Sequence, residues 1–150
     1  MFNVFNKPQA DAILIAKLQI KRHESCRLKM YKDSKGINTI GWGFNLDANE
    51  IPQEVADLLL DYMFEDAVAV AKDYCGEVWN DLNEARKAVI INLAYNMGRK
   101  TLFSLWTFQT AVKSKNWDYG AARLMSYAWF KDVGIRGAEL VKQWKTGEVA

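Results

Sequence analysis

The sequence predicts an α+β protein that is mainly helical, with a small β-hairpin lobe near the N-terminus joined by a long helix to an all-helical C-terminal lobe. Apolar residues at helical spacing dominate the 150 residues. Between residues 30 and 46 this spacing gives way to a turn-rich, β-branched and glycine-spaced run that is typical of short strands. The length fits one domain, residues 1–150, with lobes at roughly 13–60 and 75–150 and residues 1–12 as an N-terminal extension.

Composition narrows the class of protein. Half of the residues are hydrophobic and 25% are charged, which excludes a disordered chain and a membrane protein. The net charge of +2 gives no strong electrostatic case for nucleic acid, where a concentrated basic face is expected. It permits mild attraction to a polyanionic surface.

The N-terminus shows no secretory signal, and no apolar run is long enough to span a bilayer, so we expect the protein to accumulate in a cytoplasm. Its two cysteines, Cys26 and Cys75, are then expected to be reduced and buried. A disulfide between them stays open, but no sequence rule supports it. Two cysteines and one histidine give no metal-site spacing, and no cofactor is expected.

The first predicted helix covers residues 8–24. It begins at Asn6-Lys7-Pro8, a capping residue followed by proline in the first turn, and delivers Glu24 at its C-terminal end. There the helix macrodipole disfavours a negative charge and favours the protonated carboxyl, which suits a general acid.

Five further stretches predict the remaining helices. Pro52 opens a helix of about 22 residues, roughly 33 Å long, that ends at Cys75-Gly76. Capping-box spacing over Asp81–Glu84 precedes a uniformly apolar helix, the expected centre of the C-terminal lobe, which Gly98 closes. The short helices are expected at Ser104–Lys113, Asn116–Tyr127 and Arg136–Thr146.

Three polar residues surround the predicted hairpin: Glu24 at the helix end, Asp33 in the first turn and Thr39 on the returning strand. Two carboxylates on either side of a glycosidic bond are the minimum needed to hydrolyse it. The spacing alone favours a plainer interpretation, in which Glu24 is a solvated helix-end residue, Asp33-Ser34-Lys35-Gly36 is ordinary turn chemistry and Thr39 serves β-propensity.

The complete motif, with its flanking residues, decides between these interpretations. Glu-x8-Asp-x5-Thr, with Tyr-Lys-Asp before the turn and Thr-Ile-Gly-Trp-Gly after it, closely resembles the active-site segment of phage-type lysozymes, the muramidases and endolysins of glycoside hydrolase family 24. The resemblance covers most of the chain, from about Leu18 to Gly147. It includes Ala85–Gly98, similar to the core helix of the family, and Trp129, Arg136 and Trp144-Lys145-Thr146-Gly147, similar to its C-terminal pattern.

The resemblance implies a lysozyme-like fold and a role for each catalytic residue. Glu24 would protonate the leaving oxygen, Asp33 would stabilise positive charge and help activate a water, and Thr39 would hold that water. The family inverts configuration, which needs carboxyl groups about 6.5–9.5 Å apart. Substrate contacts are expected at Gly43, Asn45, Tyr95, Asn96 and Arg136. Arg136 would also face Glu24 across the cleft.

Two positions depart from the family. Phe44 and Asn45 follow the second glycine, where many members carry a histidine, and Ser25 stands where glycine is common after the acid. Any ion pair made by that histidine is therefore absent. For Gly41 and Gly43 the alternatives are a strand bent by glycine and a backbone that a sugar can approach. Tyr95 and Asn96 would, as bare sequence, be core and cap residues.

The resemblance implies an endolysin that hydrolyses the β-1,4 bond between N-acetylmuramic acid and N-acetylglucosamine in bacterial peptidoglycan. A monomer without stable membrane association is expected. It would wait in the host cytoplasm and act on the wall, in the periplasm, after a separate pore-forming protein opens the inner membrane. The alternatives are a virion-associated wall-degrading lysozyme, a non-catalytic peptidoglycan-binding module and a lytic transglycosylase. A helical DNA-binding protein is disfavoured by the near-neutral charge.

Overall fold

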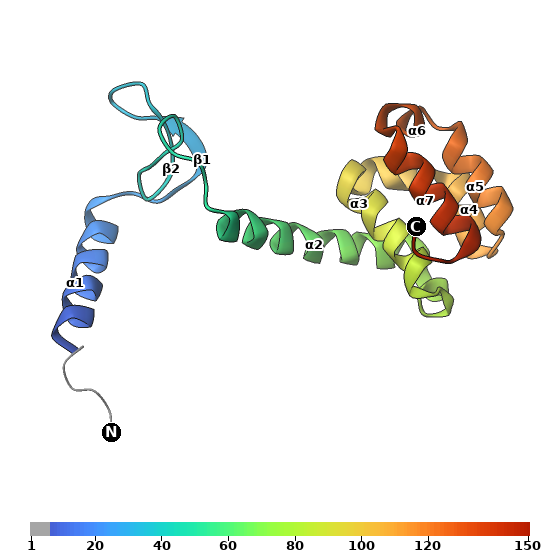
Figure 1. The fold of residues 1–150 in the computed structure, drawn as a ribbon, viewed down its shortest axis with the longest axis horizontal. Coiled ribbons are helices and arrows are strands. Elements are labelled where there is room, and N and C mark those ends of the chain that lie inside the picture. Colours follow the sequence, from blue (N-terminus) through green and yellow to red (C-terminus); the bar gives the residue numbers. More distant parts are fainter. Residues whose placement is uncertain (1–6) are drawn as a thin grey trace. The chain divides into compact units, whose positions relative to one another are not determined.

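The computed structural model describes the backbone of residues 7–150 and the side chains from residue 12 onward. The chain divides into two compact units, unit 1 (Met1–Ala56) and unit 2 (Asp57–Ala150), and each is described by itself. The predicted α+β class is confirmed, because a small antiparallel sheet is followed by a long helical region (Figure 1). None of the described helices combines the length and the apolar character needed to cross a membrane.

Unit 1 contains a helix and a three-stranded sheet. Helix α1 spans Lys7–His23 and matches the predicted helix, although the expected capping residue Asn6 lies outside the described residues. The strands are β1 (Arg27–Lys32), β2 (Asn38–Gly41) and β3 (Phe44–Asn45), in the order β1-β2-β3. Both strand pairs are antiparallel, and Thr39 in the central strand is paired with Tyr31 on one side and Asn45 on the other.

Helix α2 spans Gln53–Cys75 and confirms the predicted long helix. Its start follows Pro52, whose carbonyl accepts hydrogen bonds from two N–H groups in the first turn. It stops at Gly76, which takes a left-handed φ of +59° that glycine adopts at little cost.

Helix α3 spans Glu84–Ser104 in two helical segments; it corrects the predicted capping residue and confirms the predicted break at Gly98. The side chain of Asn83, not of Asp81, caps it, because Asn83 Oδ1 accepts a hydrogen bond from Arg86 N. Gly98 ends the first helical segment, as predicted. Its φ of +70° and ψ of +169° are non-helical and kink the chain, and a second helical segment follows up to Ser104.

The rest of unit 2 consists of short helices. Three were predicted: α4 (Trp106–Lys113), α5 (Trp117–Ser126) and α7 (Ile135–Thr146). Two were not, the 3₁₀ helix η2 (Gly76–Asp81) and α6 (Ala128–Val133). Both are only six residues long, too short for apolar spacing to show a period.

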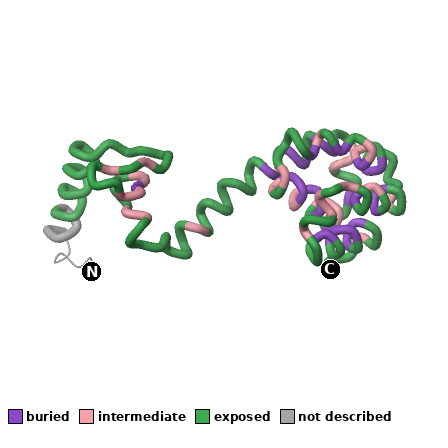
Figure 2. The backbone as a smooth tube through the Cα atoms, turned by 90° about the horizontal axis from the view of Figure 1, so that it is seen from above, coloured by how far each residue is buried: buried purple, intermediate pink, exposed green. Residues whose placement is uncertain are grey.

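The hydrophobic core lies in unit 2, where α2–α5 and α7 supply buried residues and α6 packs partly buried aromatic residues against them (Figure 2). Its centre is aromatic: the ring centroids of Phe108 and Trp144 lie 5.0 Å apart, and Tyr74 packs against Phe108 at 6.3 Å. The Tyr74 hydroxyl donates to the Leu105 carbonyl at 2.8 Å, so this buried polar group is satisfied.

The two cysteines are free, and they differ in burial. Cys75 is buried, as predicted, and burial raises the pKa of its thiol to about 12. The prediction that Cys26 is buried is wrong. It lies in the exposed segment between α1 and β1, where no neighbouring side chain covers it.

Candidate active site

Glu24 occupies the junction between α1 and the sheet. Its backbone N–H donates to the Ile20 carbonyl at 2.8 Å, so the helical hydrogen-bond pattern continues through Glu24. Its side chain is exposed, and β1 begins three residues later. The predicted placement of this carboxyl at a helix end is therefore confirmed.

Asp33 is held by the turn between β1 and β2. Its Oδ1 accepts hydrogen bonds from Lys35 N at 2.8 Å and Ile37 N at 2.9 Å, while its own N–H donates to the Ile37 carbonyl at 3.0 Å. Gly36 supplies the left-handed φ of +78° that the turn requires. The carboxyl is fixed through one oxygen, and Oδ2 is not part of this turn network.

Thr39 and Asp33 both donate a hydrogen bond to the backbone carbonyl of Ile37. Thr39 Oγ1 donates to this carbonyl at 3.1 Å, the same oxygen that accepts the Asp33 N–H. Thr39 is only 4% exposed, and no other residue among the described residues of unit 1 is buried. Because the hydroxyl hydrogen is committed to Ile37, the Thr39 oxygen is left as a hydrogen-bond acceptor.

Gly43 lies in the turn between β2 and β3, and Asn45, the last residue of β3, shapes the turn that follows this strand. Gly41 and Gly43 have φ values of +65° and +92°, and a Cβ on either would meet no atom within 4 Å. Backbone conformation, not lack of space in this structure, therefore explains the two glycines. Asn45 Oδ1 accepts from the backbone N–H groups of Asp47 and Ala48, both at 3.0 Å, and its Nδ2 takes no part in that turn.

A polar clasp that the sequence did not reveal closes the hairpin. Asp47 accepts from Asn38 N at 3.0 Å and from Asn38 Nδ2 at 2.8 Å. The backbone hydrogen bond and then the side-chain bond from Asn38 lower the pKa of Asp47. Lys32 Nζ donates to Asn38 Oδ1 at 3.3 Å and joins β1 to the clasp.

A second polar cluster lies in unit 2, around the C-terminal part of the first segment of α3. Asn96 Nδ2 donates to the carbonyl and to Oδ1 of Asn92, both at 2.8 Å, and Arg136 Nη1 donates to Asn96 Oδ1. Asn92 was missed in the sequence. The spacing of four residues between two asparagines on one predicted helix was the available signal.

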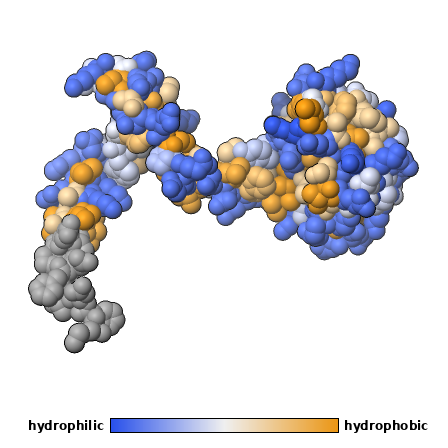
Figure 3. Space-filling view, viewed as in Figure 1, coloured by the Kyte–Doolittle hydropathy of each residue, from blue (hydrophilic) through white to orange (hydrophobic). Residues whose placement is uncertain are grey.

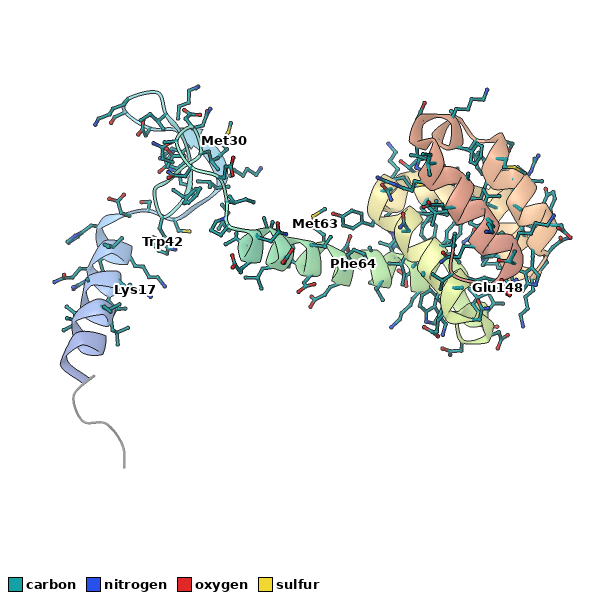
Figure 4. The ribbon with its side chains drawn as sticks, in the orientation of Figure 1. Lys17, Met30, Trp42, Met63, Phe64 and Glu148 are labelled. Atoms are coloured by element: carbon teal, nitrogen blue, oxygen red, sulfur yellow. The ribbon has the colours of Figure 1, made fainter. Side chains whose placement is uncertain are left out.

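Tyr95 borders a pocket of about 530 Å³ between α2 and α3. Its ring lies 5.2 Å from that of Phe64, and its hydroxyl lies 4.0 Å from Met63 Sδ, the two α2 residues labelled in Figure 4. The pocket is lined by Tyr62, Met63, Glu65, Asp66, Ala67, Ala94, Tyr95 and Gly98. Tyr95 is thus half-buried but keeps an edge on an open, mixed polar and apolar surface.

The predicted site residues form two groups. Asp33 and Thr39 meet through the Ile37 peptide in unit 1, and Asn96 and Arg136 meet in unit 2. The expected pairing of Arg136 with Glu24 joins residues of different units and stays a prediction, as do the substrate contacts. Among the described residues, no group of three or more His, Cys, Asp or Glu side chains is arranged to hold a metal ion.

A helix-end glutamate, a turn aspartate and a threonine on a small sheet, followed by a helical region, define a lysozyme-like α+β protein. A profile of the family described as "Phage lysozyme" matches residues 21–145, and the chain belongs to this family. The chain is also similar to the "Probable T4-type lysozyme 2" of Dictyostelium discoideum, with 23% identity over 156 aligned positions that cover 85% of this chain and 92% of that protein. Membership of the family places the chain among lysozyme-type glycoside hydrolases.

Proposed function

We propose that this protein is a muramidase that hydrolyses the β-1,4 bond between N-acetylmuramic acid and N-acetylglucosamine in peptidoglycan, with inversion of configuration. The observation that carries the proposal is the sharing of the Ile37 peptide by Asp33 and Thr39, next in the chain to the helix-end Glu24. Family membership supports the substrate class.

The chemistry follows from the free atoms of the three side chains. Glu24 gives its proton to the leaving glycosidic oxygen as the bond to the anomeric carbon breaks. A water attacks that carbon from the opposite face and loses a proton to Asp33 Oδ2, because Oδ1 is occupied by the turn. The second hydrogen of the water is accepted by Thr39 Oγ1, whose own hydrogen points to Ile37.

The products give the first test. Purified sacculi are digested, and the released fragments are analysed by mass spectrometry. Reducing N-acetylmuramic acid ends are expected. Reducing N-acetylglucosamine ends or anhydro-muramic ends would show that a different bond or a lytic transglycosylase reaction is involved, and no release would leave a non-catalytic binding module. Proton NMR at early times should show the α-anomer first if the configuration inverts.

Glu24→Gln is the matching test of the general acid. An amide cannot deliver the proton, and loss of general acid catalysis costs roughly 10²–10⁴-fold in rate. Glu50→Gln is the matched control, because Glu50 is an exposed glutamate of the same unit that lies in the loop before α2. If Glu24→Gln kept a tenth of the wild-type rate, Glu24 would not be the acid.

The proposal extends to the biological role. We propose host-cell lysis, in which the enzyme leaves the host cytoplasm and reaches the wall after a separate pore-forming protein opens the inner membrane. Expression in bacteria with and without an inner-membrane pore-former tests it. Lysis should need both, and lysis by this chain alone at the same rate would remove the dependence on a pore.

A further inference from the structure

The positive charge of the chain is concentrated beside the candidate active site. Residues 21–35, called here the cationic segment, contain two acidic side chains, Glu24 and Asp33, and six cationic ones, for a local charge of +4. The whole chain carries +2, so the remaining residues together carry −2. The cations are Lys21, Arg22, Arg27, Lys29, Lys32 and Lys35.

These six cations are exposed and form no ion pair among the described residues. The ion pairs of the described chain all lie in unit 2, where lysines and arginines meet acidic partners at 2.6–3.0 Å. The space-filling view shows hydrophilic surface interspersed with hydrophobic patches over the sheet of unit 1 (Figure 3). The cationic segment therefore has a net positive charge that no ion pair within the described residues neutralises, whereas unit 2 pairs part of its charge internally.

Neutral groups hold three of the cations in place. The Arg27 guanidinium lies 4.4 Å from the centroid of the Tyr31 ring, and Lys21 Nζ lies 5.6 Å from that of Trp42. Lys32 Nζ donates to the Gly36 carbonyl at 3.2 Å. These contacts restrict the side chains without neutralising them, which lowers the entropic cost of binding an anion.

We propose that the cationic segment binds the carboxylates of the peptide stems on the same peptidoglycan strand whose glycan the site cleaves. The inference rests on the proposed function and adds a second class of contact to it. The cations lie on both sides of Glu24 and Asp33 in the chain and belong to the same compact unit, so we expect an anion bound to them to lie near the reacting sugars. On peptidoglycan the nearest anions are the stem carboxylates, which the lactyl group of each N-acetylmuramic acid carries.

The test measures binding in a background that cannot cleave, Glu24→Gln. Lys29→Gln with Lys35→Gln removes two charges, and neither ammonium group makes a hydrogen bond, ion pair or cation–π contact within the described residues. Lys100→Gln with Lys142→Gln is the matched control, because these exposed lysines of unit 2 lower the net charge equally. Each protein is sedimented with sacculi from which phosphate polymers have been stripped.

At about 20 mM salt the Lys29/Lys35 variant should bind about three- to tenfold more weakly than its parent, as expected for two exposed charge contacts. The control should bind within about twofold. The difference should vanish near 1 M salt, where the Debye length is about 3 Å. On glycan strands freed of peptide by an amidase, the Lys29/Lys35 variant should bind like its parent.

Equal weakening of both double variants would show a non-specific charge effect and overturn the proposal. The same weakening on peptide-free strands would move the contact to the glycan and also overturn it, as would tighter binding of a DNA oligonucleotide than of sacculi at equal salt. Because the background does not cleave, these results are independent of the digestion products that test the muramidase proposal.

Discussion

Thr39→Val separates a catalytic threonine from a structural one. The Thr39 hydroxyl donates to the Ile37 carbonyl, but that carbonyl also accepts the Asp33 N–H at 3.0 Å. Removing the hydroxyl therefore leaves no unsatisfied carbonyl. The expected loss in the free energy of unfolding is that of one net hydrogen bond, about 0.5–1.5 kcal/mol.

The effect on the rate should be much larger. If Thr39 Oγ1 holds the attacking water, its loss misplaces the nucleophile, which costs on the order of 100-fold in kcat. That corresponds to about 2.7 kcal/mol of activation free energy. Thr39→Ser is the matched control, because it keeps the hydroxyl and removes only the methyl group. It should stay within about tenfold of wild type.

The assay pairs initial rates of turbidity loss on purified sacculi with thermal unfolding followed by circular dichroism. A loss of about 1 kcal/mol should lower Tm by roughly 2–4 °C in a chain of this size. If Thr39→Val retained more than a third of the wild-type rate, or if Thr39→Ser lost as much as Thr39→Val, the water-holding role would be wrong. Thr39 would then be a buried strand residue.

Three further outcomes are expected. Asp33→Asn and Asp33→Glu should each lower kcat by about 10²-fold or more. The asparagine amide cannot accept the proton, and the longer glutamate side chain enters the space of the attacking water. Near-normal rates in both variants would show that Asp33 is only a turn residue. Gly120→Ala should lower the free energy of unfolding, measured by urea titration, because the new Cβ would lie 2.3 Å from Trp144 Nε1. The clash should cost about 1–3 kcal/mol, and the better helix propensity of alanine should offset up to about 1 kcal/mol of this cost. An unchanged urea midpoint would contradict this packing. A thiol reagent at pH 8 should label Cys26 quickly and Cys75 only in denaturant, because burial raises the pKa of the Cys75 thiol to about 12; rapid labelling of both in the native protein would contradict the burial of Cys75.

Local signals in the sequence predicted the elements that carry the candidate site. Pro52 and Gly76 bound α2 because proline starts helices readily and glycine takes the left-handed conformation that ends them. Asp33 was placed in its turn because an aspartate followed by a glycine three residues later is ordinary turn chemistry. These features depend on residues close together in the chain, and a single sequence contains them.

Features fixed by distant partners were not predicted. Asp81 and Asn83 are both good capping residues, and contacts with the C-terminus distinguish them. Asn83 Nδ2 donates to the Gly147 carbonyl at 2.8 Å, and Arg86 Nε donates to the Trp144 carbonyl at 2.9 Å. Local spacing does not show which of two caps meets a partner about sixty residues away.

Contacts that the sequence did not predict also determine which atoms of unit 2 can bind a sugar. Asn96 was expected to contact the substrate, but its Nδ2 donates twice to Asn92 and its Oδ1 accepts from Arg136. One oxygen lone pair is all that remains on the amide. Arg136 has five N–H groups and spends one here, so it keeps donors for a substrate oxygen while Asn96 fixes its direction. In unit 2, Arg136 and the exposed edge of the Tyr95 ring are therefore better equipped than Asn96 to contact a glycan.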